Sequence, residues 1–172
     1  MRGVGMRGMA LLDVLAVLTV LGVLFAAAIP AVSSLYARAA VEYEAMRLVA
    51  ELRRVQAISR TTAMSLYMLE GERAWERMPR LWIRSDGYDL NRPFAGDVRV
   101  HGALPLVRFY QETMNNTPVV FNQNSGIAQS WSSNMTIRVY VAGHEEDALR
   151  VVIDRGARIR LRRGAYNAAD EE

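Results

Sequence analysis

The sequence predicts an α+β protein in which a long N-terminal helix packs on a mainly antiparallel β-sheet domain. Three observations indicate this fold class. Residues 9–37 are almost wholly apolar, with Asp13 as their only charge. Apolar residues then recur at steps of three or four up to about Arg60, which is typical of a helix with one buried face. Beyond Arg60, short β-prone runs alternate with turn residues.

The apolar stretch is long enough to cross a membrane. About twenty residues at a rise of about 1.5 Å span the hydrocarbon of a bilayer, so a transmembrane segment is predicted over about residues 9–32. The only charges of residues 1–8 are Arg2 and Arg7. Because basic residues stay on the cytoplasmic side, we expect a single pass with a cytoplasmic N-terminus and a domain on the other side.

Asp13 needs a partner in such a helix. A carboxylate there costs about 2.5 to 3.5 kcal/mol on insertion scales. If the chain is cut after Gly8, Met9 becomes a cationic amine one helical turn before Asp13, in the same chain or in a neighbouring copy. Pro30 lacks an amide proton, so we expect a bend without a break there.

These residues together resemble the N-terminus of a type IV prepilin: Arg7-Gly8 before an apolar residue, an acid five residues after Gly8, and Pro30. The resemblance implies that a prepilin peptidase cuts between Gly8 and Met9 and methylates the new amine of Met9. It also implies that Asp13 acts in assembly and that Pro30 kinks the helix. The family nearly always has Glu where this chain has Asp13.

Two other interpretations of the stretch are open. A secretory signal would be cut after Ala28, but such signals have apolar regions of about 7 to 15 residues without an early acid. An ordinary one-pass anchor fits the length and leaves Asp13 unexplained.

The amphipathic half of the helix is predicted to bury one face. The apolar positions assigned to that face are Leu35, Ala39, Met46, Val49, Leu52, Val55 and Ile58. The charged positions assigned to the other faces are Arg38, Glu42, Glu44, Arg47, Glu51, Arg53 and Arg54. The predicted parts are therefore a leader over residues 1–8, a helix over 9–62 and a β-rich periplasmic or extracellular domain over 63–172.

Strands are predicted where β-prone residues cluster between turn signals such as Asp86-Gly87 and Asp154-Arg155-Gly156. The predicted strands are residues 63–69, 81–84, 98–101, 106–110, 119–121, 135–142, 148–153 and 157–161. Residues 71–91 are the least regular, and both a hairpin and a partner surface remain open for them.

Three segments narrow the resemblance to the GspH/FimT group of minor pseudopilins and minor pilins. They are residues 51–60, 119–126 and 151–156, the last followed by alternating arginines. Ala157 interrupts the closing Gly-Arg-x-Arg pattern of the group. The resemblance implies that the partners are other pseudopilins or pilins of one filament, the prepilin peptidase and an inner-membrane assembly platform.

Composition argues against catalysis and metal binding. The chain has no cysteine, and its two histidines, His101 and His144, lie far apart in the sequence without ligands at metal spacing. Residues 122–126 supply no acid, so a turn is favoured there over a calcium loop. No catalytic motif is present. We therefore expect no enzyme, no metal and no cofactor.

Arginines alternate with apolar residues near the C-terminus. Arg158, Arg160 and Arg162 are expected on one face of a strand, with Ala157, Ile159 and Leu161 packed inward. Arg155 and Arg163 flank them. The five arginines form either a solvated edge or an anion site for carboxylates or DNA phosphates. Without the leader the side chains carry 19 arginines against 18 acids, so net charge by itself does not imply nucleic acid.

The predicted function is that of a GspH-like minor pseudopilin of a type II secretion system, held in the inner membrane and acting in protein export by assembly. The alternative is a FimT-like minor type IV pilin that binds DNA during natural transformation. A third interpretation is a secreted binding domain with a removable signal.

Overall fold

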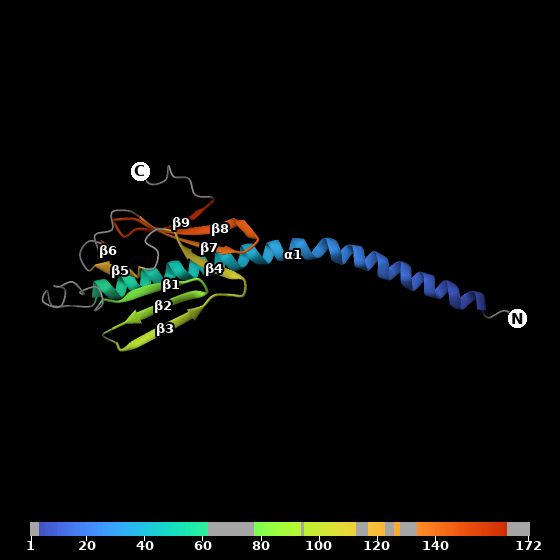
Figure 1. Ribbon diagram of the computed structural model, residues 1–172, viewed down its shortest axis with the longest axis horizontal. Helices are drawn as coiled ribbons and strands as arrows, with labels where there is room; N and C mark the ends of the chain where they lie inside the picture. The colour runs from blue at the N-terminus through green and yellow to red at the C-terminus, as the bar shows by residue number, and fades with distance from the viewer. Residues whose placement is uncertain are drawn as a thin grey trace. The chain divides into compact units, whose positions relative to one another are not determined.

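The fold combines one long helix with two antiparallel sheets. The computed structural model describes residues 4–61, 78–93, 95–112, 117–122, 126–127 and 134–164. The chain divides into two compact units, residues 1–36 and 37–172, and helix α1 (Val4–Thr61) passes through both. Within the second unit, both sheets lie against α1 (Figure 1). The α+β prediction is therefore confirmed.

The sheets are formed by nine strands of the described residues. The first sheet has the order β3-β2-β1-β5-β6, and the second has the order β4-β7-β8-β9. The strands are β1 (Arg80–Arg84), β2 (Gly87–Arg92), β3 (Asp97–Gly102), β4 (Val107–Gln111), β5 (Val119–Asn122), β6 (Gly126–Ile127), β7 (Met135–Val141), β8 (His144–Ile153) and β9 (Ile159–Arg163). Strand β7 shows the period of two: Met135, Ile137, Val139 and Val141 are buried, and the residues between them are partly exposed.

The strand predictions agree with the structure in position and differ in detail. Strand β8 begins at His144, four residues before the predicted start, and β9 begins at Ile159. Ala157 lies before β9 with a φ of 57°, in the left-handed region outside the β conformation, but its side chain is buried in the core as predicted. Leu161, predicted to pack inward, is 42% exposed because β9 is an edge strand of its sheet. The strand predicted over residues 63–69 lies outside the described residues.

Strand β2 was not predicted. It forms a hairpin with β1 through the Asp86-Gly87 turn, with Arg84 paired to Gly87, so the hairpin interpretation holds for the described residues 78–91. A Cβ on Gly87 would lie 2.0 Å from the carbonyl oxygen of His101 in β3. Glycine is therefore required where these strands approach each other.

The buried face of α1 differs from the predicted one. Leu35 and Met46 are 69% and 54% exposed, whereas Leu52 and Val55 are buried as expected. The buried positions follow the helical period through small residues: Ala37, Ala40, Val41, Glu44, Ala45, Leu48, Leu52, Val55 and Ser59. The prediction placed large apolar residues on the buried face and was wrong for Leu35 and Met46. Alanines occupy much of that face because their small side chains let the helix approach the sheets closely, although they are only weakly hydrophobic.

Glu44, predicted on a polar face, is 1% exposed. One carboxylate oxygen lies 2.8 Å from Nε2 of His101, and the other accepts a 2.9 Å hydrogen bond from the backbone N–H of Leu104. A buried carboxylate is tolerated only where such partners replace water. Glu44 therefore ties α1 to the connection between β3 and β4.

Tyr88 packs beside this contact. Its ring lies 4.7 Å from the His101 ring and 5.9 Å from the Phe109 ring, in the second case edge to face. Its hydroxyl is buried and has no hydrogen-bond partner among the described residues. Burial raises the pKa of Tyr88 to about 12.

Replacing Glu44 by alanine is expected to lower the free energy of unfolding by about 3 kcal/mol, because the substitution leaves His101 and the Leu104 amide without their partner. Urea unfolding of the full chain in detergent measures the loss. Glu42→Ala is the matched control, since that side chain is 50% exposed two residues away and should cost about 0.5 kcal/mol or less. Equal losses in the two variants would contradict the anchoring role of Glu44.

Tyr88 is expected to make the fold sensitive to alkaline pH. Between pH 10 and 12 the folded protein keeps a phenol proton that the unfolded chain loses, so the free energy of unfolding falls as the pH rises through that window. Tyr88→Phe should remove this part of the pH dependence and keep stability at pH 7, because the ring still packs. Urea unfolding between pH 10 and 12 tests this expectation. The control is Tyr43→Phe, at a half-exposed tyrosine, which should leave the pH dependence of the free energy of unfolding unchanged.

Candidate functional site

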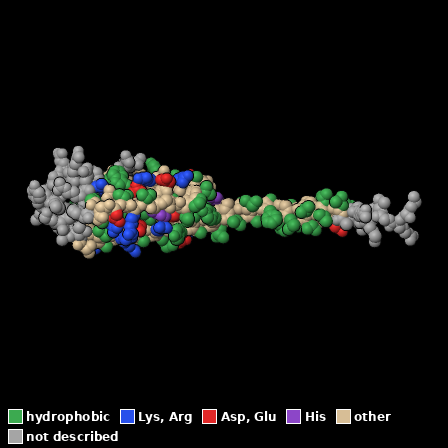
Figure 2. All heavy atoms as spheres, turned by 90° about the horizontal axis from the view of Figure 1, so that it is seen from below, with side chains coloured by type: hydrophobic (Ala, Val, Ile, Leu, Met, Phe, Trp, Pro, Cys, Tyr) green, Lys and Arg blue, Asp and Glu red, His purple; other side chains and the backbone are tan. Residues whose placement is uncertain are grey.

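The first unit consists of an exposed apolar helix. From Leu11 to Tyr36 every residue of α1 is exposed except the half-exposed Ser34, and Phe25 and Ile29 remain 65% and 66% exposed. An 18-residue window of this helix has a mean hydropathy of 2.5, which is long and apolar enough to cross a membrane. Figure 2 shows hydrophobic side chains along it. A single helix of this length and composition could anchor the protein in a membrane.

The residues predicted for processing and assembly lie on this helix. Gly8 and Met9 fall within the bounds of α1. Asp13 is exposed, and no cation of the described residues pairs with it. The side chains described for this helix therefore leave Asp13 without a cationic partner.

Pro30 does not interrupt α1, which confirms that the helix is unbroken there. The hydroxyls of Ser33 and Ser34 donate to the carbonyls of Pro30 and Ala31 at 2.9 and 3.0 Å. Thr19 likewise donates to the Leu15 carbonyl at 2.7 Å. These bonds satisfy hydroxyls within a segment that otherwise offers no polar partners.

In the second unit, the end of α1, the turn before β9 and the start of β9 form a cleft of about 420 Å³, here called the arginine cleft. Its lining residues are Arg53, Gln56, Arg60, Gly156, Ala157, Arg158, Ile159 and Arg160. The lining holds four guanidinium groups and no carboxylate. Among the described residues, no acid pairs with Arg53 or Arg60. Guanidinium groups bind carboxylates and phosphates through paired N–H donors, so the cleft is suited to an anion.

The turn between β8 and β9 shapes one wall of this cleft. The Asp154 carboxylate accepts hydrogen bonds from the Arg158 backbone N–H and from Arg158 Nε, both at 2.9 Å. Gln56 donates to the Ala157 carbonyl at 3.0 Å and holds the turn against α1. Burial by itself raises the pKa of Asp154, but the Arg158 contacts outweigh it, and this pKa lies below its ordinary value. Asp154 is therefore ionised and partly compensates Arg158.

The five predicted arginines do not share one site. Arg158 and Arg160 line the cleft, Arg155 is exposed in the turn, and Arg163 lies in a different pocket. Arg162 belongs to the outer face of the second sheet, where the strand register places Arg138, Arg150 and Arg162 side by side. Sequence reasoning missed Arg53 and Arg60, because their proximity to β9 depends on packing across about a hundred residues of chain.

Arg138, Arg150 and Arg162, here called the arginine row, would repel one another if left alone. The Arg138 guanidinium carbon lies 4.6 Å from the centre of the Tyr140 ring and 6.0 Å from that of Tyr110. Arg150 Nε lies 3.3 Å from Glu112 Oε1. Two tyrosine rings and one carboxylate thus offset part of the positive charge of this row.

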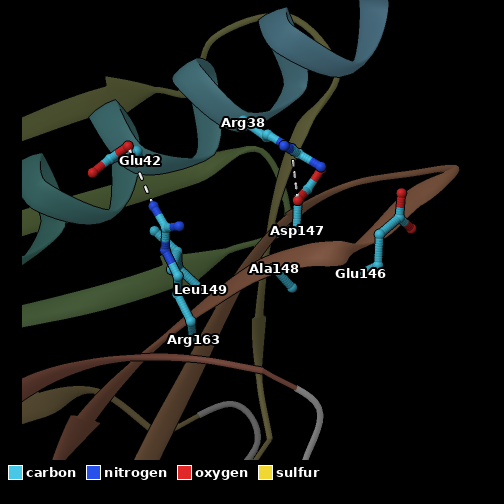
Figure 3. A pocket seen from close by; sticks show the side chains of 7 residues that line it. All are labelled: Arg38, Glu42, Glu146, Asp147, Ala148, Leu149 and Arg163. Atoms are coloured by element: carbon cyan, nitrogen blue, oxygen red, sulfur yellow. Dashed lines mark hydrogen bonds and ion pairs between the residues drawn. The ribbon is translucent and has the colours of Figure 1, made fainter.

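The second pocket contains both signs of charge (Figure 3). It has a volume of about 260 Å³ and is lined by Arg38, Glu42, Glu146, Asp147, Ala148, Leu149 and Arg163. Arg38 Nε lies 2.9 Å from Asp147, and Arg163 reaches to within 3.6 Å of Glu42. We call it the mixed-charge pocket. Because both of its arginines are paired with acids, substitutions in this pocket serve as controls for substitutions in the arginine cleft.

The histidines have different surroundings. His101 Nε2 lies 2.8 Å from the Glu44 carboxylate. Contrary to the sequence prediction, potential ligand atoms of His144, Glu146 and Asp147 lie within 4.8 Å of one another. However, the Asp147 carboxylate is already paired with the guanidinium group of Arg38, so a metal cation would have to displace Arg38 to bind there.

The chain was also compared with models of protein families, with characterised proteins and with solved structures. No family model matches it, and neither of the other two comparisons gives a significant match.

Proposed function

We propose that this chain is a pilin-like subunit that acts by assembly, and that its leading role is that of a GspH-like minor pseudopilin of a type II secretion system. The observation that carries the proposal is the exposed apolar helix from Leu11 to Tyr36 with Asp13 as its only charge. A membrane accepts the apolar surface before assembly, and neighbouring helices accept it in a filament.

The proposed processing creates a cationic partner for Asp13. A prepilin peptidase cuts between Gly8 and Met9 and methylates the Met9 amine, which remains cationic. In the filament, the amine of one copy pairs with Asp13 of another. The remaining partners are the pseudopilins of the same filament and the inner-membrane assembly platform, and the β-rich domain lies on the periplasmic side.

Asp13→Ala tests this proposal. The variant should be inserted and cleaved normally, because the cut site is intact, but should be lost from the filament, since a buried amine would have no counter-charge. Co-purification with filament partners measures incorporation, after intact-mass analysis has shown that the chain begins at methylated Met9. Asp13→Glu is the control and should assemble. Equal co-purification of Asp13→Ala and wild type would contradict the pairing, and a chain beginning at Ile29 would contradict the processing.

A second candidate function is that of a FimT-like minor pilin that binds DNA during transformation. The arginine cleft favours it, because four guanidinium groups without a lining acid form a site for phosphates. Gene neighbourhood separates the two candidates at low cost: secretion ATPase and secretin genes indicate export, and competence genes indicate transformation.

The DNA-binding candidate predicts salt-sensitive binding of a duplex by the processed full chain in detergent. Arg158→Gln combined with Arg160→Gln should weaken binding and reduce the slope of log affinity against log salt by about two. Arg53→Gln combined with Arg60→Gln should act equally. Arg38→Gln combined with Arg163→Gln removes the same charge from the mixed-charge pocket and should keep most of the affinity. If all three variants weaken binding alike, only net charge matters and the cleft is not the DNA site.

A further inference from the structure

The arginine cleft has an excess of positive charge that the described residues do not neutralise. Its four arginines face one nearby carboxylate, that of Asp154, which lies 2.9 Å from Arg158 and 3.9 Å from Arg160. A net charge of +3 therefore remains. The arginine row has three arginines and one acid, Glu112, with tyrosine rings beside Arg138, and the mixed-charge pocket has two arginines and three lining acids. Among the described residues, the cleft therefore has the largest positive excess of the three arginine groups, which makes it the strongest candidate for binding an outside anion.

The chain supplies a segment of matching charge. Asp170, Glu171 and Glu172 carry three carboxylates within three residues, without a basic residue after Arg163. The segment follows β9, and the arginine cleft lies at the beginning of that strand. Charge complementarity and chain order therefore point to the same pairing.

The connecting chain is long enough for this pairing. Gly164 lies four residue steps beyond Arg160, or about 13 Å along the strand direction. The six residues from Gly164 to Asp170 span about 20 Å when extended. The chain can therefore turn back along the edge strand β9 and bring its acids to the cleft of the same molecule.

We propose that the acidic segment Asp170–Glu172 docks in the arginine cleft of its own chain and competes there with external anions. The carboxylates pair with Arg53, Arg60, Arg158 and Arg160. Because these pairs are solvent-accessible, salt weakens them, and a polyanion that offers more charges displaces the segment. The proposal requires neither filament assembly nor DNA binding, although it would regulate the cleft if DNA is its ligand.

Distance measurement between two spin labels tests the docking directly. The chain contains no cysteine, so Ala168→Cys combined with Ala50→Cys, an exposed position one turn before Arg53, labels only these two sites. The experiment uses the processed full chain in detergent, diluted into an excess of unlabelled protein. We expect a narrow population of short distances at low salt, which about 1 M NaCl removes, since the Debye length then falls to about 3 Å.

Charge variants decide the outcome. Neutralising the segment with Asp170→Asn, Glu171→Gln and Glu172→Gln should remove the short-distance population, and so should Arg53→Gln combined with Arg60→Gln. The control, Arg38→Gln combined with Arg163→Gln, should keep it. The proposal is overturned if neutralising the segment leaves the distances unchanged, or if the control variant loses the population as well. Loss of the population on dilution would overturn docking within the same chain and assign the segment to a second copy.

A duplex-binding measurement on the same variants separates this inference from the proposed function. If the cleft binds DNA, neutralising the segment should raise duplex affinity and steepen the salt slope by up to about three. If DNA binding fails in every variant while the spin-label result holds, the second candidate function is wrong and the docking stands.

Discussion

The buried carboxylate of Glu44 fixes how α1 lies against the sheets. Its two oxygens are held by His101 and by the Leu104 amide, so the helix can rotate or slide only by breaking both contacts. The small residues Ala37, Ala40 and Ala45 on the same face allow the close approach that places Glu44 within reach. Once this register is set, the last turns of α1 lie beside the turn before β9, and Gln56 meets the Ala157 carbonyl.

That register also determines where the arginines gather. Arg53 and Arg60 project from the end of α1 toward the cleft that Arg158 and Arg160 line, whereas Arg38 and Arg163 meet acids in the mixed-charge pocket. The two groups differ in their balance of charge: one carboxylate, that of Asp154, faces the four arginines of the cleft, whereas three carboxylates line the mixed-charge pocket beside its two arginines. A guanidinium group that is already paired has fewer donors free for a ligand.

The first unit has a different physical basis. In the second unit apolar side chains are buried within the chain, but from Leu11 to Tyr36 they are exposed on an isolated stretch of helix. Such a segment is long and apolar enough to lie in a membrane, and its exposed side chains could also pack against other helices. Asp13 restricts that surrounding further, because its carboxylate requires a cation there.

The sequence alone determined the long helix, its apolar half and most strands, because these depend on local composition and on periods of two and of three to four residues. It also identified Asp13 and the C-terminal arginines as unusual. Only the tertiary structure shows which face α1 buries, and that this face includes Glu44. It also shows strand β2 and brings Arg53 and Arg60 together with Arg158 and Arg160 in one cleft. These features depend on contacts between residues far apart in the chain. Such contacts allow the carboxylate of Glu44 to be buried, and they bury alanines of α1 while Leu35 stays exposed.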